Sequence, residues 1–234
     1  MTALAIVTML WHDPRYRRGQ PYDARHVNRL AWSVSRNLTT PHHHVCLTEE
    51  DTSEINSGVT CLPFPTRDYD RMGGCWRKLQ LFGEEIGQIV DAERLLYLDL
   101  DTVICGSLDP LVCEDVPIAL VRCRDKRTPY NTSAILMTAG RFPHIWDSFV
   151  ADPVAATRDS ALAGMIGDDQ AWVSLRLDPH QRAWSAEDGV LNFEQHADGR
   201  ELPENARMVY FAGPHDPAQS EVQARNPWVE RHWR

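Results

Sequence analysis

The sequence of 234 residues predicts an α/β protein built on a mostly parallel, doubly wound sheet flanked by helices. Short apolar segments that are typical of buried strands alternate with longer segments in which apolar residues recur at helical spacing. The segment RLLYLDLDTVI at 94–104 begins as an uninterrupted apolar strand and then presents two aspartates. No internal repeat or low-complexity linker divides the chain, so we expect a single domain over residues 1–234.

The first part of the chain predicts three strands and two helices. Asp23 can cap a helix that runs to about Asn37. A pair of glycines, Gly73-Gly74, predicts a turn, and a helix is expected to follow it over residues 76–90. The expected strands are residues 4–10, 44–48 and 59–64.

The second part predicts four further strands and two further helices. The expected strands are residues 94–104, 117–123, 130–137 and 207–211. The expected helices are residues 142–150 and 168–177. The tail after Gly213 shows no clear period and is expected to be irregular.

The amino-acid composition argues against some classes of protein function. A formal net charge of −9 argues against a protein whose main task is to coat nucleic acid, since that task needs lysine and arginine on phosphate. The six cysteines form no C-x-x-C pair and are expected to be reduced thiols of a cytoplasmic protein. We expect neither a signal peptide nor a membrane span, because no apolar run approaches about 20 residues.

The pair Asp99 and Asp101 carries the clearest chemical signal. Residues two apart in a strand face the same side, so both carboxylates are expected to project together from the carboxyl end of a central strand. Ligands bind at that edge of an open α/β sheet. Two such carboxylates repel each other unless a cation lies between them, and Mg²⁺ or Mn²⁺ suits both oxygen ligands and a diphosphate. The alternative is that one aspartate only caps a turn.

Four segments occur in an order that resembles a known family. They are Val7-Thr8 in the first strand, Trp76-Arg77-Lys78-Leu79 ahead of RLLYLDLDTVICGSLDPL, YNTSAILM at 130–137, and Gly167-Asp168-Asp169-Gln170. With this order and spacing, roughly residues 3 to 215 resemble the GT-A fold glycosyltransferases. The resemblance is strongest to the retaining group that includes glycogenin and galactosyltransferases.

The resemblance implies an enzymatic activity and a different function for each half of the chain. It implies transfer of a hexose or pentose from a nucleotide-diphosphate sugar, a UDP-sugar above all, with Mn²⁺ or Mg²⁺ as cofactor and retention at the anomeric carbon. The nucleotide-binding half is expected over about 1–110 and the acceptor-side half over about 111–234 of one GT-A-like domain.

The resemblance also implies roles for individual residues. Thr8, Arg77 and Lys78 are expected on the donor side, where Lys78 would stabilise the charge that develops on the leaving diphosphate. The alternative for Lys78 is a solvated base at a helix start, where the helix dipole disfavours it. The metal ligands would be Asp99, Asp101 and His215, and the sugar and acceptor side would be lined by Asn131, Asp169 and Gln170.

The chain departs from the family pattern near its end. The family's motif H-F-x-G-x-x-K-P supplies a metal-binding histidine and a phosphate-binding lysine. In this sequence Tyr210 replaces the histidine and Asp216 replaces the lysine, while His215 lies close by. Ser133 replaces a glycine of the family in the strand at 130–137. His215 is therefore the expected third ligand by proximity to the motif.

Two other functions and several acceptors stay open at this point. A nucleotidyltransferase that makes nucleotide sugars would also use paired carboxylates, and Arg17-Arg18-Gly19 faintly matches its basic, glycine-rich loop. A non-catalytic nucleotide- or sugar-binding module would explain the altered late motif. The acceptor could be a glycan, a protein, a small molecule or a modified phage DNA base. The basic loop with Arg15, Arg17 and Arg18 could contact nucleotide phosphates or an anionic acceptor.

Overall fold

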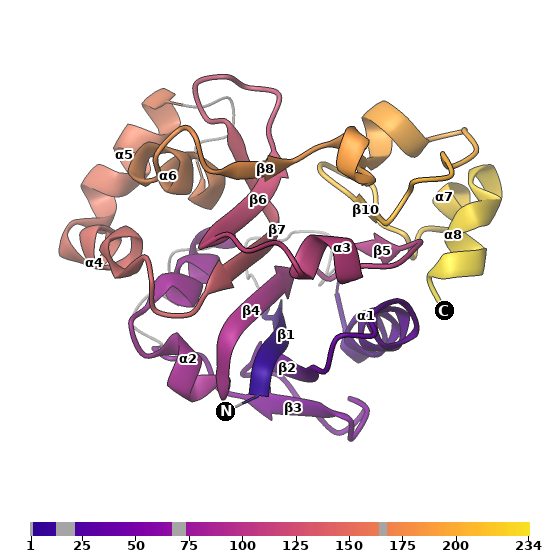
Figure 1. Ribbon diagram of the computed structural model, residues 1–234, viewed down its shortest axis with the longest axis horizontal. Helices are drawn as coiled ribbons and strands as arrows, with labels where there is room; N and C mark the ends of the chain where they lie inside the picture. Colours follow the sequence, from indigo (N-terminus) through magenta and orange to yellow (C-terminus); the bar gives the residue numbers. More distant parts are fainter. Residues whose placement is uncertain (1, 13–21, 67–73, 164–167) are drawn as a thin grey trace.

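The computed structural model describes residues 2–12, 22–66, 74–163 and 168–234 (Figure 1). A sheet of seven strands has the order β3-β2-β1-β4-β7-β6-β8, and a sheet of three strands has the order β5-β10-β9. Every neighbouring pair in the large sheet is parallel except the two pairs that β7 makes, with β4 and with β6. The predicted α/β class with a mostly parallel sheet is confirmed. The basic loop with Arg15, Arg17 and Arg18, together with Gly73 and Gly167, lies outside the described residues.

Most strands lie at the predicted positions, but no strand was predicted at Arg182–Trp184 or at Val190–Asn192. The large sheet contains β1 (Thr2–Leu10), β2 (His43–Thr48), β3 (Val59–Leu62), β4 (Ala92–Leu98), β6 (Ile118–Arg122), β7 (Tyr130–Thr138) and β8 (Arg182–Trp184). The small sheet contains β5 (Val103–Ile104), β9 (Val190–Asn192) and β10 (Met208–Tyr210). The single strand expected at 94–104 is thus divided between the two sheets, because the chain turns sharply after Leu98.

Helices connect the strands and cover the sheet. The α-helices are α1 (Ala24–Asn37), α2 (Ile86–Ile89), α3 (Asp109–Val112), α4 (Pro143–Ala151), α5 (Pro153–Ala163), α6 (Asp169–Arg176), α7 (Ser220–Arg225) and α8 (Pro227–His232). Two 3₁₀ helices, η1 (Gly74–Phe82) and η2 (Ala186–Asp188), and a π-helical turn, η3 (Phe193–Ala197), complete the fold. Asp23 caps α1 as predicted, since its side chain accepts a hydrogen bond from the amide of Arg25.

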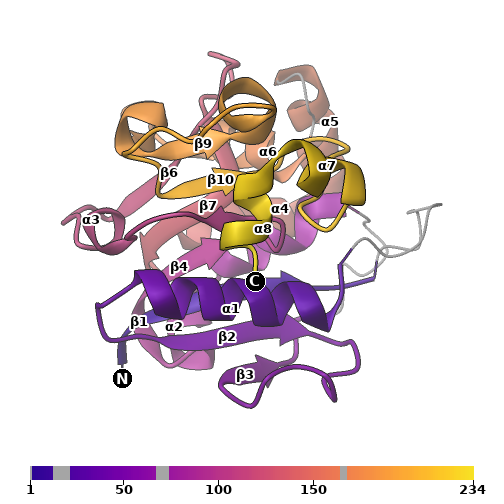
Figure 2. The same cartoon turned by 90° about the vertical axis from the view of Figure 1, so that its right-hand side faces the viewer.

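The helices cover the large sheet on both faces, which makes it doubly wound. On one face, α1 places Val27, Leu30 and Val34 against apolar residues of β1, β2 and β4. On the other face, η1, α4 and α6 pack around Tyr97 and the neighbouring strand residues. Figure 1 shows α4, α5 and α6 to the left of the sheet, whereas Figure 2 shows α1 in front with α8 above it. The sheet is therefore buried between two apolar layers.

Two further sequence-based expectations were wrong. Residues 76–90 do not form one helix: they divide between η1 and the short α2. Every residue from Trp76 to Phe82 is buried, so this segment is packed on all sides and does not form an amphipathic helix with one solvent face. The tail after Gly213 is not irregular, because it forms α7 and α8, and Ser33 of α1 donates a hydrogen bond to the carbonyl of His232 (3.1 Å).

All six cysteines are free thiols, as expected from their spacing. Burial raises the pKa of Cys46 and of Cys105 to about 12, so neither ionises near neutral pH. They act as small apolar residues of the core. Within the described residues, none of the helices has the length and apolar character needed to cross a membrane.

The strand order fixes where a ligand can bind. From β1 the chain adds β2 and β3 on one side, and then adds β4 on the other side of β1. The order therefore reverses between β1 and β4, and the carboxyl ends of these strands open a crevice at that point. Because β7 runs antiparallel to β4, its amino end lies at the same edge. This edge brings the residues after Leu98 close to those that begin at Tyr130.

Candidate active site

A cavity of about 230 Å³ opens at the edge where the strand order reverses. Its walls come from segments that are distant in the sequence: the turn after β4, η1, the amino end of β7, the start of α6 and the segment after β10. The charged and amide side chains of these walls are Lys78, Asp99, Asp101, Asn131, Asp168, Asp169 and Gln170. Most of the site residues predicted from the sequence therefore meet in one place.

Asp99 and Asp101 reach the cavity from a turn, which corrects the predicted geometry. Strand β4 ends at Leu98, and the amide of Thr102 donates to the carbonyl of Asp99 (3.0 Å) to close the turn. The amide of Asp99 donates to the carbonyl of Ser133 on β7 (2.9 Å), which fixes the start of the turn. Both carboxylates still line the cavity, but the turn and not strand alternation brings them there.

A buried lysine holds Asp99. Nζ of Lys78 lies 2.7 Å from Oδ1 and 2.9 Å from Oδ2 of Asp99, and the hydroxyl of Tyr97 donates to Oδ1 at 2.6 Å. Burial alone would lower the pKa of Lys78, but the surrounding groups, the carboxylate of Asp99 first among them, together outweigh this effect and the pKa lies well above its ordinary value. Lys78 is therefore charged at all physiological pH values, and its position at the start of a helix is explained by this ion pair.

Asp101 has a different environment from Asp99. Its side chain is buried, and the hydroxyl of Tyr22 donates to Oδ2 at 2.8 Å. The other oxygen, Oδ1, is buried and has no hydrogen-bond partner among the described residues. Burial raises the pKa of the Asp101 carboxyl above its ordinary value, and the charge of Asp99 raises it further. Among the described residues, this carboxyl group therefore has no ion-pair partner of its own.

The start of α6 supplies the opposite wall of the cavity. Asp168 caps the helix through a hydrogen bond from the amide of Gln170 (3.2 Å). Asp169 is buried, and its Oδ2 accepts a hydrogen bond from the hydroxyl of Thr132 on β7 at 2.7 Å. Asn131, also on β7, donates from Nδ2 to Oε1 of Gln170 at 2.9 Å. These contacts hold the amide and carboxylate groups in fixed positions at the cavity wall.

Carboxylates outnumber cations in the described walls of this cavity. Asp99, Asp101, Asp168 and Asp169 line it, whereas Lys78 is the one lysine or arginine among the lining residues that the structure describes. Burial raises the pKa of Asp168 to about 7, and the charge of Asp169 acts in the same direction. A cavity with this balance attracts cations and repels a bare diphosphate.

Two residues predicted for the donor side lie outside the cavity. Thr8 is buried in β1, where its hydroxyl is a hydrogen-bond partner of the Cys46 thiol. Arg77 is buried beside Lys78 in η1, with its guanidinium 4.9 Å from the centre of the Phe64 ring. Neither side chain is among the lining residues, so the structure does not bring them to the aspartates.

His215 is also apart from the two aspartates. Its side chain is 40% exposed, its Nε2 lies 3.8 Å from Oε1 of Glu194, and its ring packs edge-on against Phe193. Within the described ranges of the chain, no three His, Cys, Asp or Glu side chains are grouped so as to hold a metal ion. The chain turns at Gly213, whose φ is +112°, and the exposed side chain of His215 follows this turn.

The neighbouring Asp216 points inward instead. Its side chain is 13% exposed, Oδ1 lies 3.6 Å from Nε2 of His26, and Oδ2 is buried without a partner in the described part of the chain. Its charge raises the pKa of Asp101, so the two carboxylates lie near enough to interact. Tyr210, at the position of the family's histidine, is buried and bonded to Asn192.

Sequence reasoning missed several residues that complete the site. Tyr97 lies two positions before Asp99, and this spacing was a signal that its side chain could reach the same carboxylate. Thr132 follows Asn131 directly and could have been included with it. Tyr22 contacts Asp101 across 79 positions, and nothing in its own segment indicates this contact.

Several solved glycosyltransferase structures share this fold. The galactosyltransferase LgtC, in complex with donor and acceptor sugar analogs, aligns with a TM-score of 0.64 and 14% identity over 97% of this chain and 96% of its own. The glycosyltransferase GlyE of Streptococcus pneumoniae aligns with a TM-score of 0.63 and 14% identity over 98% of this chain and 60% of its own. The bifunctional glycosyltransferase WbbM aligns with a TM-score of 0.58 and 12% identity over 99% of this chain and 50% of its own. No family model and no curated protein sequence matches the chain.

Proposed function

Because the chain adopts the GT-A glycosyltransferase fold, we propose that it moves a hexose or pentose from a UDP-sugar to an acceptor, with a divalent metal and with retention at the anomeric carbon. The observation that carries the proposal is the pair Asp99 and Asp101 at the edge where ligands bind in an open α/β sheet. On this proposal, residues of about 1–110 bind the nucleotide and residues of about 111–234 form the acceptor side.

The donor groups of the cavity fit Mn²⁺ or Mg²⁺. Oδ1 of Asp101 is a buried oxygen without a partner among the described residues, which a cation would satisfy. Asp99 offers a second carboxylate from the same turn, and the excess of carboxylates over cations favours a bound metal. Asp99 and Asp101 would therefore hold the ion. When bound, the metal neutralises charge on the leaving diphosphate.

Lys78 would contribute to the same charge stabilisation. Its ammonium is charged at neutral pH because Asp99 and other neighbouring groups together keep its pKa well above the ordinary value. The ion pair fixes the ammonium beside Asp99, and the preorganised charge needs no reorganisation when the sugar–phosphate bond breaks. Lys78 would bind the diphosphate while it remains close to Asp99.

Asn131, Asp169 and Gln170 would orient the sugar. The hydrogen bond from Asn131 to Gln170 leaves the two amide donors of Gln170 for other partners. One carboxylate oxygen of Asp169 accepts a hydrogen bond from the hydroxyl of Thr132, and the other oxygen would accept one from a sugar hydroxyl. With retention, the acceptor attacks the face that the diphosphate leaves, and a phosphate oxygen takes the acceptor proton.

The test is release of UDP from a panel of UDP-sugars, measured with Mn²⁺, with Mg²⁺ and after chelation. We expect release with a divalent metal and its loss in Asp101→Asn. Calorimetric titration with UDP accompanies the assay. Absence of metal-dependent UDP binding would refute the proposal.

Two alternative functions have distinct outcomes in the same experiment. A nucleotidyltransferase would release pyrophosphate from UTP and a sugar 1-phosphate, and would not cleave UDP-sugars. A non-catalytic module would bind UDP-sugars without turnover. This second alternative is favoured by the late motif, since Tyr210 is buried on Asn192 and Asp216 adds a negative charge where a lysine would bind phosphate.

A further inference from the structure

A second cavity, of about 300 Å³, lies on the acceptor side of the candidate active site. It is formed where β6 and β8 end, against η3 and the end of β10. Residues that line the two cavities are neighbours: Val121 lines the second cavity and is paired in the sheet with Asn131, which lines the first. Tyr210 lines the second cavity, and the next residue, Phe211, lines the first. A molecule in the second cavity would therefore lie close to the candidate active site.

Two arginines in this wall have no carboxylate partner among the residues that the structure describes. Arg122 donates one hydrogen bond, to the carbonyl of Ala183 at 3.4 Å, and within the described residues Arg124 forms neither a hydrogen bond nor an ion pair. Both side chains are exposed. The carboxylate of Asp125, the next residue, forms an ion pair with Arg127 at 2.9 Å. Two guanidinium groups thus face the cavity with their charge uncompensated by an ion pair.

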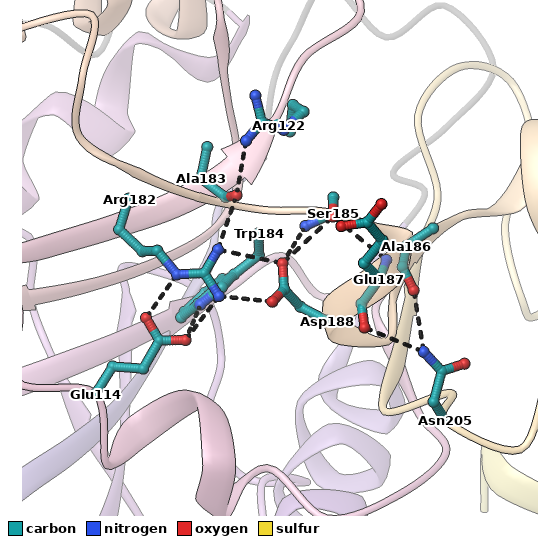
Figure 3. A network of polar contacts seen from close by, with 10 residues as sticks. All are labelled: Glu114, Arg122, Arg182, Ala183, Trp184, Ser185, Ala186, Glu187, Asp188 and Asn205. Atoms are coloured by element: carbon teal, nitrogen blue, oxygen red, sulfur yellow. Dashed lines mark hydrogen bonds and ion pairs between the residues drawn. The ribbon is translucent and has the colours of Figure 1, made fainter.

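A third arginine nearby, Arg182, differs from Arg122 and Arg124 because it is paired with carboxylates. Figure 3 shows Arg182 between two carboxylates. It contacts Glu114 at 2.9 Å and 3.0 Å and Asp188 at 2.6 Å, so its charge is fully paired. Trp184 also donates to Glu114, at 3.1 Å. This network fixes β8 and η2, which form the floor of the cavity.

His196 adds a neutral donor to the same wall. Its Nδ1 accepts a hydrogen bond from the amide of Asn192 at 3.0 Å, so the neutral ring carries its proton on Nε2. Burial lowers the pKa of His196, and the charges of Arg200 and Arg124 lower it further. One carboxylate, that of Glu187, also lines the cavity and can accept a hydrogen bond from a hydroxyl group.

We propose that this cavity binds the anionic group of the acceptor, so that the acceptor is a sugar bearing a carboxylate or a phosphate. The proposal rests on the proposed transferase function and names its acceptor class. Guanidinium groups bind both anions through paired, charge-assisted hydrogen bonds. Arg122 and Arg124 hold the anion, and the sugar extends toward Asn131 and the donor site.

The experiment measures equilibrium binding of three probes: glucuronate, glucose 6-phosphate and glucose. Wild-type protein is compared with Arg124→Gln and with Arg122→Gln. Lys126→Gln is the matched control, since Lys126 is an exposed cation of the same loop that does not line the cavity. We expect at least one anionic probe to bind, glucose to bind about tenfold or more weakly, and Arg124→Gln to remove this preference.

The probes separate the two sources of negative charge. Preference for glucuronate identifies a uronic acid acceptor, and preference for glucose 6-phosphate identifies a sugar phosphate. Equal binding of glucose and the two anions, or equal loss in Lys126→Gln and Arg124→Gln, would overturn the proposal. Unfolding by urea verifies that each variant is as stable as the wild type.

The binding test of the second cavity and the test of the transferase function can fail separately. Anion binding that depends on Arg124, combined with no metal-dependent binding of UDP, would support the cavity and reject the transferase. Metal-dependent UDP cleavage without any preference for the anionic probes would support the transferase and reject the acceptor class.

Discussion

Lys78 and Asp99, 21 positions apart, form a buried ion pair in which one ammonium contacts both carboxylate oxygens. The pair joins η1 to the turn after β4 and so connects two walls of the cavity. Removing one member of such a pair leaves a buried charge without compensation. Substitutions of the two aspartates of the turn should therefore change the free energy of unfolding by different amounts, although both residues are candidate metal ligands.

Asp99→Asn is expected to lower the free energy of unfolding by about 3 kcal/mol, because Lys78 loses its counter-charge. Asp101→Asn is the matched control and should leave stability unchanged or raised, since burial and Asp99 already disfavour a charge at this position. Urea denaturation at pH 7 measures both. Equal destabilisation by the two variants would contradict this account.

Asp101→Asn is expected to abolish metal-dependent binding of UDP while the fold remains stable. The substitution removes the buried oxygen that has no partner within the described ranges. Calorimetric titration of UDP with and without Mn²⁺ measures the effect, and Asp99→Asn should give the same loss. Unchanged affinity in both variants would show that the metal is not held by this turn.

His215→Ala tests the predicted third metal ligand. If His215 binds the ion, the segment after Gly213 must move, because the histidine is 40% exposed beside Glu194 in this structure. We expect Mn²⁺ affinity to fall at least tenfold, whereas His180→Ala, at another exposed histidine, should have no effect. If Asp216→Asn alone weakens Mn²⁺, then Asp216 and not His215 is the ligand.

Asp169→Asn and Gln170→Ala are expected to lower kcat by about a hundredfold, with little effect on donor affinity. Their contacts with the sugar should strengthen in the transition state, so the loss appears in turnover. Proton NMR of the anomeric coupling should show an α-linked product from an α-linked donor. A β-linked product would refute retention and would make Asp169 the candidate general base.

Asp109→Ala is expected to lower the free energy of unfolding by about 1–2 kcal/mol. Asp109 accepts hydrogen bonds from the amides and hydroxyls of Thr39 and Thr40, and these bonds hold its pKa well below the ordinary value. A depressed carboxyl pKa stabilises the fold above about pH 4, and this stabilisation is lost as pH falls through the folded pKa.

Urea denaturation between pH 2 and pH 8 checks the pH dependence of this difference between wild-type protein and Asp109→Ala. The difference should be constant above about pH 5 and should shrink below about pH 4. A difference that persists unchanged at the lowest pH would mean that the charge of Asp109 is not what stabilises the loop after α1.

The sequence predicted those parts of the fold that one local pattern determines. Asp23 and the apolar stripe after it are sufficient to predict α1, and the apolar run before Asp99 is sufficient to predict β4. The order of Lys78, Asp99, Asn131 and Asp169 along the chain also predicted most of the cavity walls. The helix and the strand depend on neighbouring residues in the chain, whereas the cavity walls were expected from the family resemblance.

Long-range contacts determined the parts that could not be predicted. Tyr22 meets Asp101 only because α1 begins beside the carboxyl end of β4. The chain path after Gly213 exposes His215 and buries Asp216, and no local pattern distinguishes these two neighbours. The spacing of residues 76–82 suggested a helix with one apolar face, but elements distant in the chain, among them α4 and α6, bury this segment on all sides.

The central position of β1 has a consequence for synthesis. Thr2–Leu10 leaves the ribosome well before its second partner, Ala92–Leu98, which emerges about 80 residues later, or roughly 4–16 s at ordinary translation rates. During that interval one edge of a strongly apolar strand is without its native neighbour and can pair with other nascent chains. We therefore expect the yield of folded protein to depend on chaperones and to improve at lower expression temperature.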